Sequence, residues 1–441
     1  RDAELQHRLH ETHRIQSDMR QQIGNDETRA SPYGDARMQA DARLVNHAVR
    51  SGRRWAVEFR WRSRTVQPWG FDVRSTIRFG IEEEFFLSDL RTGDIVRRPP
   101  AAFVGDCRRA LGERLSSELL QCQLETTTPV VSSRDEARRH LVTSRAELIR
   151  IAERYGITVV AAGTHPLAQW RGQLGSRALR YRQLFDDFQI IAQRNLLCGL
   201  HVHAEVPPTV DRILLMNQVM RWLPMLLALS ASSPFWARRD TGMMSYRQSA
   251  YDEWPRTGIP RLFRDEDEYR RYISVLIAAR AIPDESHIWW AIRPSSRYPT
   301  LELRIADSCP RLDDAICIAD LFRTLVHQQI GAIQSGVAQC SDGIERLLIE
   351  EDRWQAKRFG VGARFISPPA AEPLDLSSTL DRFVTTCGSA LDEIDTAWAI
   401  DHARTIIRCG SSADRQRAIH ADARARGLPE RQALRQVVDA L

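Results

Sequence analysis

The sequence predicts a mixed α and β fold built on a sheet with one apolar face and one polar face. Four short segments alternate apolar residues with Glu, His, Gln or Arg, and helical patterns separate them from Ile77 onward. Because successive side chains of a β-strand point to opposite faces, each segment sorts into two sets of residues. The four segments are 77–87, 120–125, 200–206 and 300–307.

The polar set of these segments is rich in carboxylates and imidazoles. A sheet face of this kind is costly unless cations occupy it. A single glutamate in such a pattern would most simply lie on a solvated strand face. Four strands that each carry polar residues at alternate positions favour a shared site instead. The pattern therefore predicts a metal-dependent site for an anionic substrate. The polar set comprises Glu82, Glu84, Gln121, Gln123, Glu125, His201, His203, Glu205, Glu302 and Arg304.

The spacing of the acids suits two cations. Glu82 and Glu84 lie about 6.6 Å apart along one strand, so each can serve a different ion. Glu125 and Glu302 would close the sites from other strands, with His201 or His203 as a nitrogen ligand. This oxygen-rich donor set favours Mg²⁺ or Mn²⁺ over a structural zinc.

Two charged residues leave alternatives open. Glu83 points away from the polar set, so we expect it either to pair beneath the sheet, with an arginine for example, or to lie at a bulge. Arg304 shares the face of Glu302, where it could clamp a phosphoryl group or form a salt bridge with a glutamate.

Local signals predict the other elements in chain order. Ser133 and Glu136 form a capping box that begins a helix. The segment 232–260 is long, aromatic and punctuated by Gly and Pro, which predicts an ordered active-site loop. Its Arg239, Arg247 and Arg256 would supply fixed cations, and its Tyr246 and Trp254 could pack against a substrate, although loop packing and surface pairing are equally good explanations. The remaining elements are a strand over 157–162, helices near 178–195, over 211–231 and over 312–333, and a helical C-terminal part.

Composition excludes several functional classes. The net charge is +5, Lys357 is the only lysine, and no P-loop sequence occurs. No basic stripe interleaved with aromatic residues suggests nucleic acid as a partner. The apolar stretch 213–231 contains Asn217, Gln218 and Arg221, so we expect a buried helix and no contact with a membrane. Eight scattered cysteines without a CxxC pair suggest a reducing compartment, and we expect a cytoplasmic protein.

The chain divides at about residue 76. Residues 1–76 are rich in Arg, Gln, His and Asp and have weak helical signals, which predicts a poorly ordered or atypical leader, with a basic interaction arm as the alternative. Residues 77–441 are expected to form a single catalytic domain. A homodimer is plausible by base rate alone.

The motifs around these residues closely resemble the type 2 glutamate–cysteine ligase family, also called carboxylate–amine ligases. The resemblance covers about 77–430, in collinear order, and includes FGIEEEFFLSDLRTGDIV, QCQLE, AAGTHP, CGLHVHAEVP, EWPRTGIP and IRPSSRYPTLELRIAD. It implies an α+β fold of the glutamine synthetase/guanido kinase type, with a curved, mainly antiparallel sheet and helices packed on its convex face. It also implies ATP and divalent metals on the concave face, and small amino-acid substrates.

The resemblance assigns roles to particular residues. Arg304 would steady the transferred phosphate, and Glu84 or a loop carboxylate would take the proton of the amine. Glu82, Glu84, Glu125, one of His201 and His203, and Glu302 would bind the metals. The substrate and nucleotide would contact Gln123, Arg239, Asp240, Thr241, Tyr246, Arg247, Arg256 and Arg304. The reaction implied is a ligation through an acyl phosphate, with glutamate and cysteine as the leading pair.

Two positions depart from the family pattern within the matching region. Glu205 stands where glycine is expected, and Ala291 replaces an expected acid. They leave substrate choice and full activity open, and Ala291 leaves open a relative that binds nucleotide or metal without catalysis. A metal-dependent hydrolase that uses the HxH motif and the carboxylates is a separate alternative.

Overall fold

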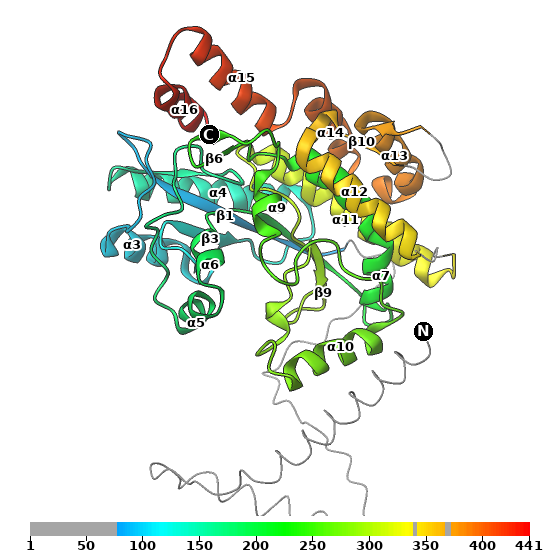
Figure 1. Ribbon diagram of the computed structural model, residues 1–441. Helices are drawn as coiled ribbons and strands as arrows, with labels where there is room; N and C mark the ends of the chain where they lie inside the picture. Colours follow the sequence, from blue (N-terminus) through cyan, green and yellow to red (C-terminus); the bar gives the residue numbers. More distant parts are fainter. Residues whose placement is uncertain (1–76, 338–341, 367–371) are drawn as a thin grey trace, which may run out of the picture. The chain divides into compact units, whose positions relative to one another are not determined.

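The computed structural model describes residues 77–337, 342–366 and 372–441. The predicted leader, residues 1–76, lies outside the described residues. The described chain is a mixed helical and antiparallel-sheet protein of the expected fold class (Figure 1).

The central sheet has seven strands, all paired antiparallel. Its long first strand, β1 (Phe79–Asp89), lies in the middle and pairs with β5 over residues 79–83, with β3 over residues 82–86 and with β4 over residues 86–89. The order is β2 (Leu115–Ser117), β3 (Gln123–Thr127), β1, β5 (Leu200–Glu205), β9 (Thr300–Leu303) and β8 (Ile292–Pro294), with β4 (Ile157–Val160) paired to β1. All four predicted segments therefore contribute to one sheet.

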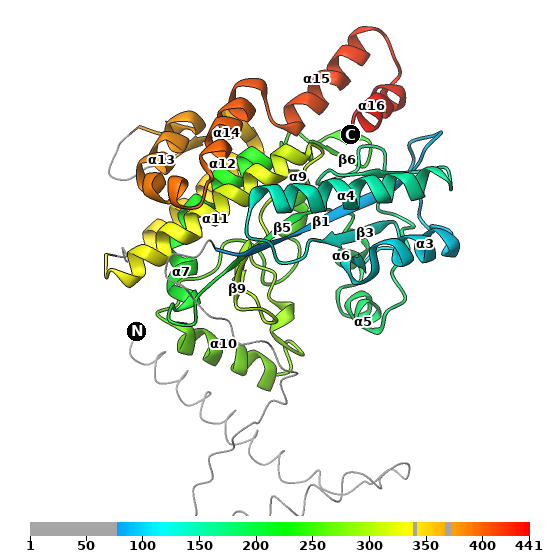
Figure 2. The same cartoon turned by 180° about the vertical axis from the view of Figure 1, so that it is seen from behind.

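One face of this sheet is covered by helices. Figure 2 shows α4 (Arg134–Glu153) and α11 (Leu312–Gln334) lying across β1 and β5. The apolar set of the strands packs there, with Phe79, Val202 and Leu303 almost fully buried in the main core. Burial of this apolar surface fixes which set of side chains faces the helices and leaves the polar set for the other face.

The predicted helices form close to their expected bounds. Ser133 caps α4 by accepting a hydrogen bond from the Glu136 N–H at 3.3 Å, and the Glu136 carboxylate accepts from the Ser132 N–H at 2.8 Å. The 178–195 stretch forms α5 (Leu179–Phe188) and α6 (Ile190–Gln193).

The apolar stretch forms α7 (Arg212–Val219) and α8 (Leu223–Ser230), joined by a 3₁₀ turn before Pro224. Among the described residues, Arg212–Ser230 is the one stretch long and apolar enough to cross a membrane, and it is 89% buried inside the protein. That burial is typical of a core helix, as predicted.

The segment 232–260 is ordered, as predicted. It forms a short hairpin, β6 (Phe235–Trp236) with β7 (Arg239–Asp240), and the helix α9 (Tyr246–Tyr251). The other described elements are α3 (Ala101–Leu111), α10 (Glu266–Ala278), α12 (Gly343–Phe359), β10 (Arg364–Phe365), β11 (Leu374–Asp375), α13 (Leu376–Glu393), α14 (Ala397–Cys409), α15 (Ser412–Ala425) and α16 (Glu430–Asp439).

Glu83 pairs beneath the sheet with an arginine, which confirms the first of the two alternatives for this residue. Its carboxylate is 1% exposed and accepts from Arg145 Nε at 3.1 Å and Nη2 at 2.5 Å. Arg145 also donates to the carbonyls of Cys309 and Pro310, both at 2.8 Å. This pair joins α4 to the sheet from the apolar side.

Replacing Arg145 with Met should lower the free energy of unfolding by about 3–5 kcal/mol, because it leaves the buried Glu83 carboxylate unpaired. Urea denaturation measures this change. Arg150→Met, which removes an exposed pair with Glu147 on the same helix, serves as the control and should change the free energy by less than about 1 kcal/mol. Equal effects of the two substitutions would contradict the role assigned to Arg145.

Candidate active site

The polar face is organised in rows of side chains that run across the strands. Strand register places Glu84 between Glu125 and Gly199, and Glu82 beside His201. The next row holds His203, Glu302 and Arg293, and the last holds Arg78, Glu205 and Thr300. The predicted acids and imidazoles therefore share one face.

Glu82 lies at the centre of two groups of potential metal ligands. His201 Nδ1 is 3.2 Å and His203 Nε2 3.3 Å from its carboxylate oxygens. Burial opposes ionisation, but the hydrogen bonds and charges of the two histidines outweigh it and hold the pKa of Glu82 well below its usual range. One group combines Glu82 with His203 and Glu302, and the other with His201 and Glu125.

A third group contains an acid that the sequence patterns missed. Glu84, Glu118 and Glu125 offer ligand atoms that all lie within 4.8 Å of one another. Burial, followed by the charge of Glu84, raises the pKa of Glu118 to about 8, and burial with the neighbouring acids raises that of Glu125 well above its usual value. Glu118 follows β2 in irregular chain, so no alternating pattern marked it.

Glu302 lies between two arginines. Arg293, on the neighbouring strand, donates to its carboxylate at 2.8 and 3.2 Å, and Arg304 donates to it as well. Burial opposes ionisation of Glu302, but Arg293 and Arg304 hold its pKa far below the usual range. Arg304 therefore forms the salt bridge with a glutamate that was one of its two predicted roles. Arg293 was missed because a single polar residue in a short strand gives no pattern.

These residues fit one or more divalent cations. The donor set consists of carboxylate oxygens and imidazole nitrogens, which suits Mg²⁺ or Mn²⁺. His201 Nε2 is buried without a hydrogen-bond partner among the described residues, although Glu84 Oε1 lies 3.7 Å away. A divalent cation could bind this unpartnered imidazole nitrogen. It would also relieve the repulsion between Glu118 and Glu125, the carboxylates whose pKa values are raised.

Two of the predicted substrate-binding residues lie at the end of the polar face nearest Glu84. Arg247 is buried, and its guanidinium lies over Gly199. Gln123 is buried and donates to the Leu197 carbonyl at 2.6 Å.

The other predicted substrate-binding residues make contacts of their own. Asp240 pairs with Arg417 at 2.6 Å, and Arg239 is exposed beside it. Thr241 donates to the Pro234 carbonyl at 2.8 Å. Tyr246 packs against Trp236, and Arg256 donates to the His287 carbonyl at 2.9 Å over the Trp289 ring. Their predicted roles in binding stay predictions.

Of the two departures from the family pattern, Glu205 lies on the polar face and Ala291 lies in the main apolar core. Glu205 forms a bidentate pair with Arg78, at 2.8 and 2.5 Å, so its added charge is neutralised. Ala291 is buried, and its carbonyl accepts from the Arg304 N–H at 2.9 Å, which sets it beside Arg304. Among the described residues Arg304 Nε has no hydrogen-bond partner.

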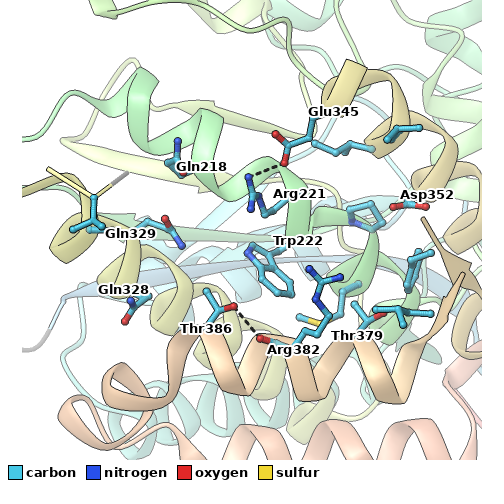
Figure 3. A pocket seen from close by; sticks show the side chains of 18 of the residues that line it. Gln218, Arg221, Trp222, Gln328, Gln329, Glu345, Asp352, Thr379, Arg382 and Thr386 are labelled. Atoms are coloured by element: carbon cyan, nitrogen blue, oxygen red, sulfur yellow. Dashed lines mark hydrogen bonds and ion pairs between the residues drawn. The ribbon is translucent and has the colours of Figure 1, made fainter. Parts of the chain in front are cut away.

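A cavity of about 1260 Å³ lies elsewhere, between the α7–α8 turn, α11, α12 and α13 (Figure 3). Its charged residues largely satisfy one another: Arg221 pairs with Glu345 at 2.7 Å and His327 with Glu393 at 2.7 Å. None of its lining residues belongs to the polar face. The cavity is therefore separate from the candidate site on the sheet.

The described chain has a glutamine synthetase-like fold of the kind found in glutamate–cysteine ligases. Two solved structures share the fold, each with a TM-score of 0.63 and each matched over 83% of this chain. One is a bifunctional glutathione synthetase from Pasteurella multocida, 17% identical over 52% of that chain. The other is a glutamate–cysteine ligase from Francisella tularensis in complex with AMP, 11% identical over 89% of that chain.

The chain belongs to glutamate–cysteine ligase family 2, whose sequence profile matches residues 78–437. A protein of Ectopseudomonas mendocina named "Putative glutamate–cysteine ligase 2" is 48% identical over 364 residues, 82% of this chain and 95% of that relative. A protein of the same name from Pseudomonas aeruginosa is 42% identical over 367 residues, 83% of this chain and 89% of that relative. The family resemblance inferred from the motifs is thereby confirmed.

Without metal, the protein should lose stability as the pH rises from about 5 to about 8.5. Glu118 holds its proton up to a pKa of about 8 when folded but releases it near 4.5 when unfolded, so the folded state binds more protons in this window. Thermal unfolding in EDTA measures the trend, and Glu118→Gln should flatten it. Added Mg²⁺ should raise the melting temperature by several degrees, most at the alkaline end. A pH trend identical in the wild type and Glu118→Gln would contradict this assignment.

Proposed function

We propose that the polar face binds ATP, two divalent cations and a carboxylate substrate, and joins that carboxylate to an amine through an acyl phosphate. The observation that carries the proposal is the set of three overlapping ligand groups, which share Glu82 and Glu125, beside the half-buried cations Arg293 and Arg304. ATP and a carboxylate bring about five negative charges together, so such a site needs fixed positive charge as well as metals.

The cations would be Mg²⁺ or Mn²⁺, held by Glu82, Glu84, Glu125, Glu302 and one of His201 and His203, as predicted, with Glu118 added by its position. When bound, they would neutralise phosphate oxygens. Of the two histidines, His201 is the better candidate for the metal ligand, because its buried Nε2 has no hydrogen-bond partner among the described residues. His203 Nδ1 already forms a hydrogen bond with Thr300 Oγ1 at 3.0 Å.

In the first step, an oxygen of the substrate carboxylate attacks the γ-phosphorus of ATP, the bond to the bridging oxygen breaks, and ADP leaves. Arg304 would steady the transferred phosphoryl group. Its Nε–H has no partner among the described residues, and Tyr251 Oη lies 3.4 Å from its Nη2. Catalysis in this step is positioning together with charge neutralisation.

In the second step, the amine attacks the acyl carbon, the bond from that carbon to the phosphate oxygen breaks, and an amide and phosphate form. The ammonium formed in the attack must lose a proton, and Glu84 or a loop carboxylate is the predicted acceptor. We expect glutamate as the carboxylate and cysteine, or another small amine, as the acceptor. A cytoplasmic location and a homodimer remain predictions.

Purified protein should release phosphate from ATP only when Mg²⁺, glutamate and one particular amine are present, and mass spectrometry should detect the matching amide. Glu302→Gln should lower the rate at least about a hundredfold, because it removes both a metal ligand and the partner of two arginines. Glu147→Gln on the exposed side of α4 is the control and should keep full activity.

The alternatives give different results in the same assay. A metal-dependent hydrolase would act without nucleotide. A non-catalytic relative would bind ATP and Mg²⁺ and release no phosphate with any amine. Either result would overturn the proposal.

A further inference from the structure

Asp307, just beyond the end of β9, is a fully buried carboxylate that ties the long loop to the sheet. Its Oδ2 accepts from the Ser232 N–H at 3.0 Å and from Ser233 Oγ at 2.6 Å, and its Oδ1 accepts from Ser245 Oγ at 2.9 Å. These serines lie at both ends of the hairpin that precedes α9. A single carboxylate thus fixes where α9 begins.

Arg247 in α9 is the nearest positive charge to this carboxylate. Its Nη1 lies 3.9 Å from Asp307 Oδ1, and its own N–H donates to Ser233 Oγ at 3.0 Å. Its guanidinium also donates to the carbonyls of Arg304, Ile305 and Ala306, at 3.3, 3.3 and 3.0 Å. Burial raises the pKa of Asp307, while Arg247 and the serine donors oppose the rise.

Gly199 leaves the space through which the Arg247 guanidinium reaches the polar face. A Cβ at position 199 would collide with Arg247 Nη2 and would lie 3.1 Å from His201 Nε2. The Gly199 N–H donates to Glu84 at 2.6 Å, so this point adjoins the Glu84 row. Any side chain there would push the cation away from the metal-ligand groups.

We propose that Asp307 is a positioning residue and Gly199 a specificity-determining gap, which together place Arg247 where it binds a carboxylate of the amino-acid substrate. The inference rests on the proposed ligase function. Arg293 and Arg304 lie together on Glu302, whereas Arg247 lies over Gly199 beside the Glu84 row. Because Arg247 already uses both terminal nitrogens on carbonyls, it suits one carboxylate contact better than a triphosphate.

Two substitutions test this inference by steady-state kinetics. Asp307→Asn removes the charge at constant shape, and Gly199→Ala adds one methyl group in the path of Arg247. Each should raise the KM for glutamate at least about tenfold and leave the KM for ATP within about twofold, because one charge-assisted contact is lost.

Matched controls separate positioning from a loss of stability. Asp320→Asn breaks another fully buried Asp–Arg pair, with Arg323 in α11, and Gly331→Ala adds a methyl group where nothing lies within 4 Å. Both should leave the ratio of the two KM values unchanged, even if Asp320→Asn lowers the melting temperature. If Asp307→Asn fails to fold, Gly199→Ala still tests the same contact.

The outcomes distinguish this inference from the proposed function. An inactive wild type with every amine would overturn the ligase proposal itself. An active wild type, with variants that change both KM values equally or neither of them, would overturn the roles of Asp307 and Gly199 alone.

Discussion

The repulsion among carboxylates on one face of a single sheet is the constraint on which the rest of the structure depends. Glu84, Glu118 and Glu125 cannot all be ionised at such short range without a cation between or beside them. The raised pKa values of Glu118 and Glu125 reflect this repulsion together with burial. Divalent cations bound at this face would relieve the same repulsion.

Two further acids on this face are paired with arginines. Arg293 and Arg304 neutralise Glu302, and Arg78 neutralises Glu205. On the opposite face, the buried acid Glu83 has its own arginine, Arg145 from α4. The sheet thus separates a face of paired charges and potential ligands from a helix-covered core, and strand alternation alone enforces that separation.

The sequence was a good guide wherever a two-residue period carried the information. It predicted the shared face of Glu82, His201 and Glu302, and the family motifs predicted the fold. It could not reveal Glu118, which sits in irregular chain, or Arg293, a single polar residue in a three-residue strand. The sequence also could not show that Arg247 is buried beside Asp307 and Gly199. These residues are distant in sequence and come together only in the folded chain.

Transfer of oxygen from the substrate carboxylate to phosphate is the most direct test of the ligase account. Glutamate labelled with ¹⁸O in its γ-carboxylate would be turned over with ATP, Mg²⁺ and the accepted amine, and the released phosphate analysed by mass spectrometry. The account predicts one ¹⁸O atom in each phosphate, because the acyl phosphate breaks between the acyl carbon and that oxygen. Phosphate without label, released together with ADP, would mean that water attacks ATP and would contradict the acyl-phosphate mechanism.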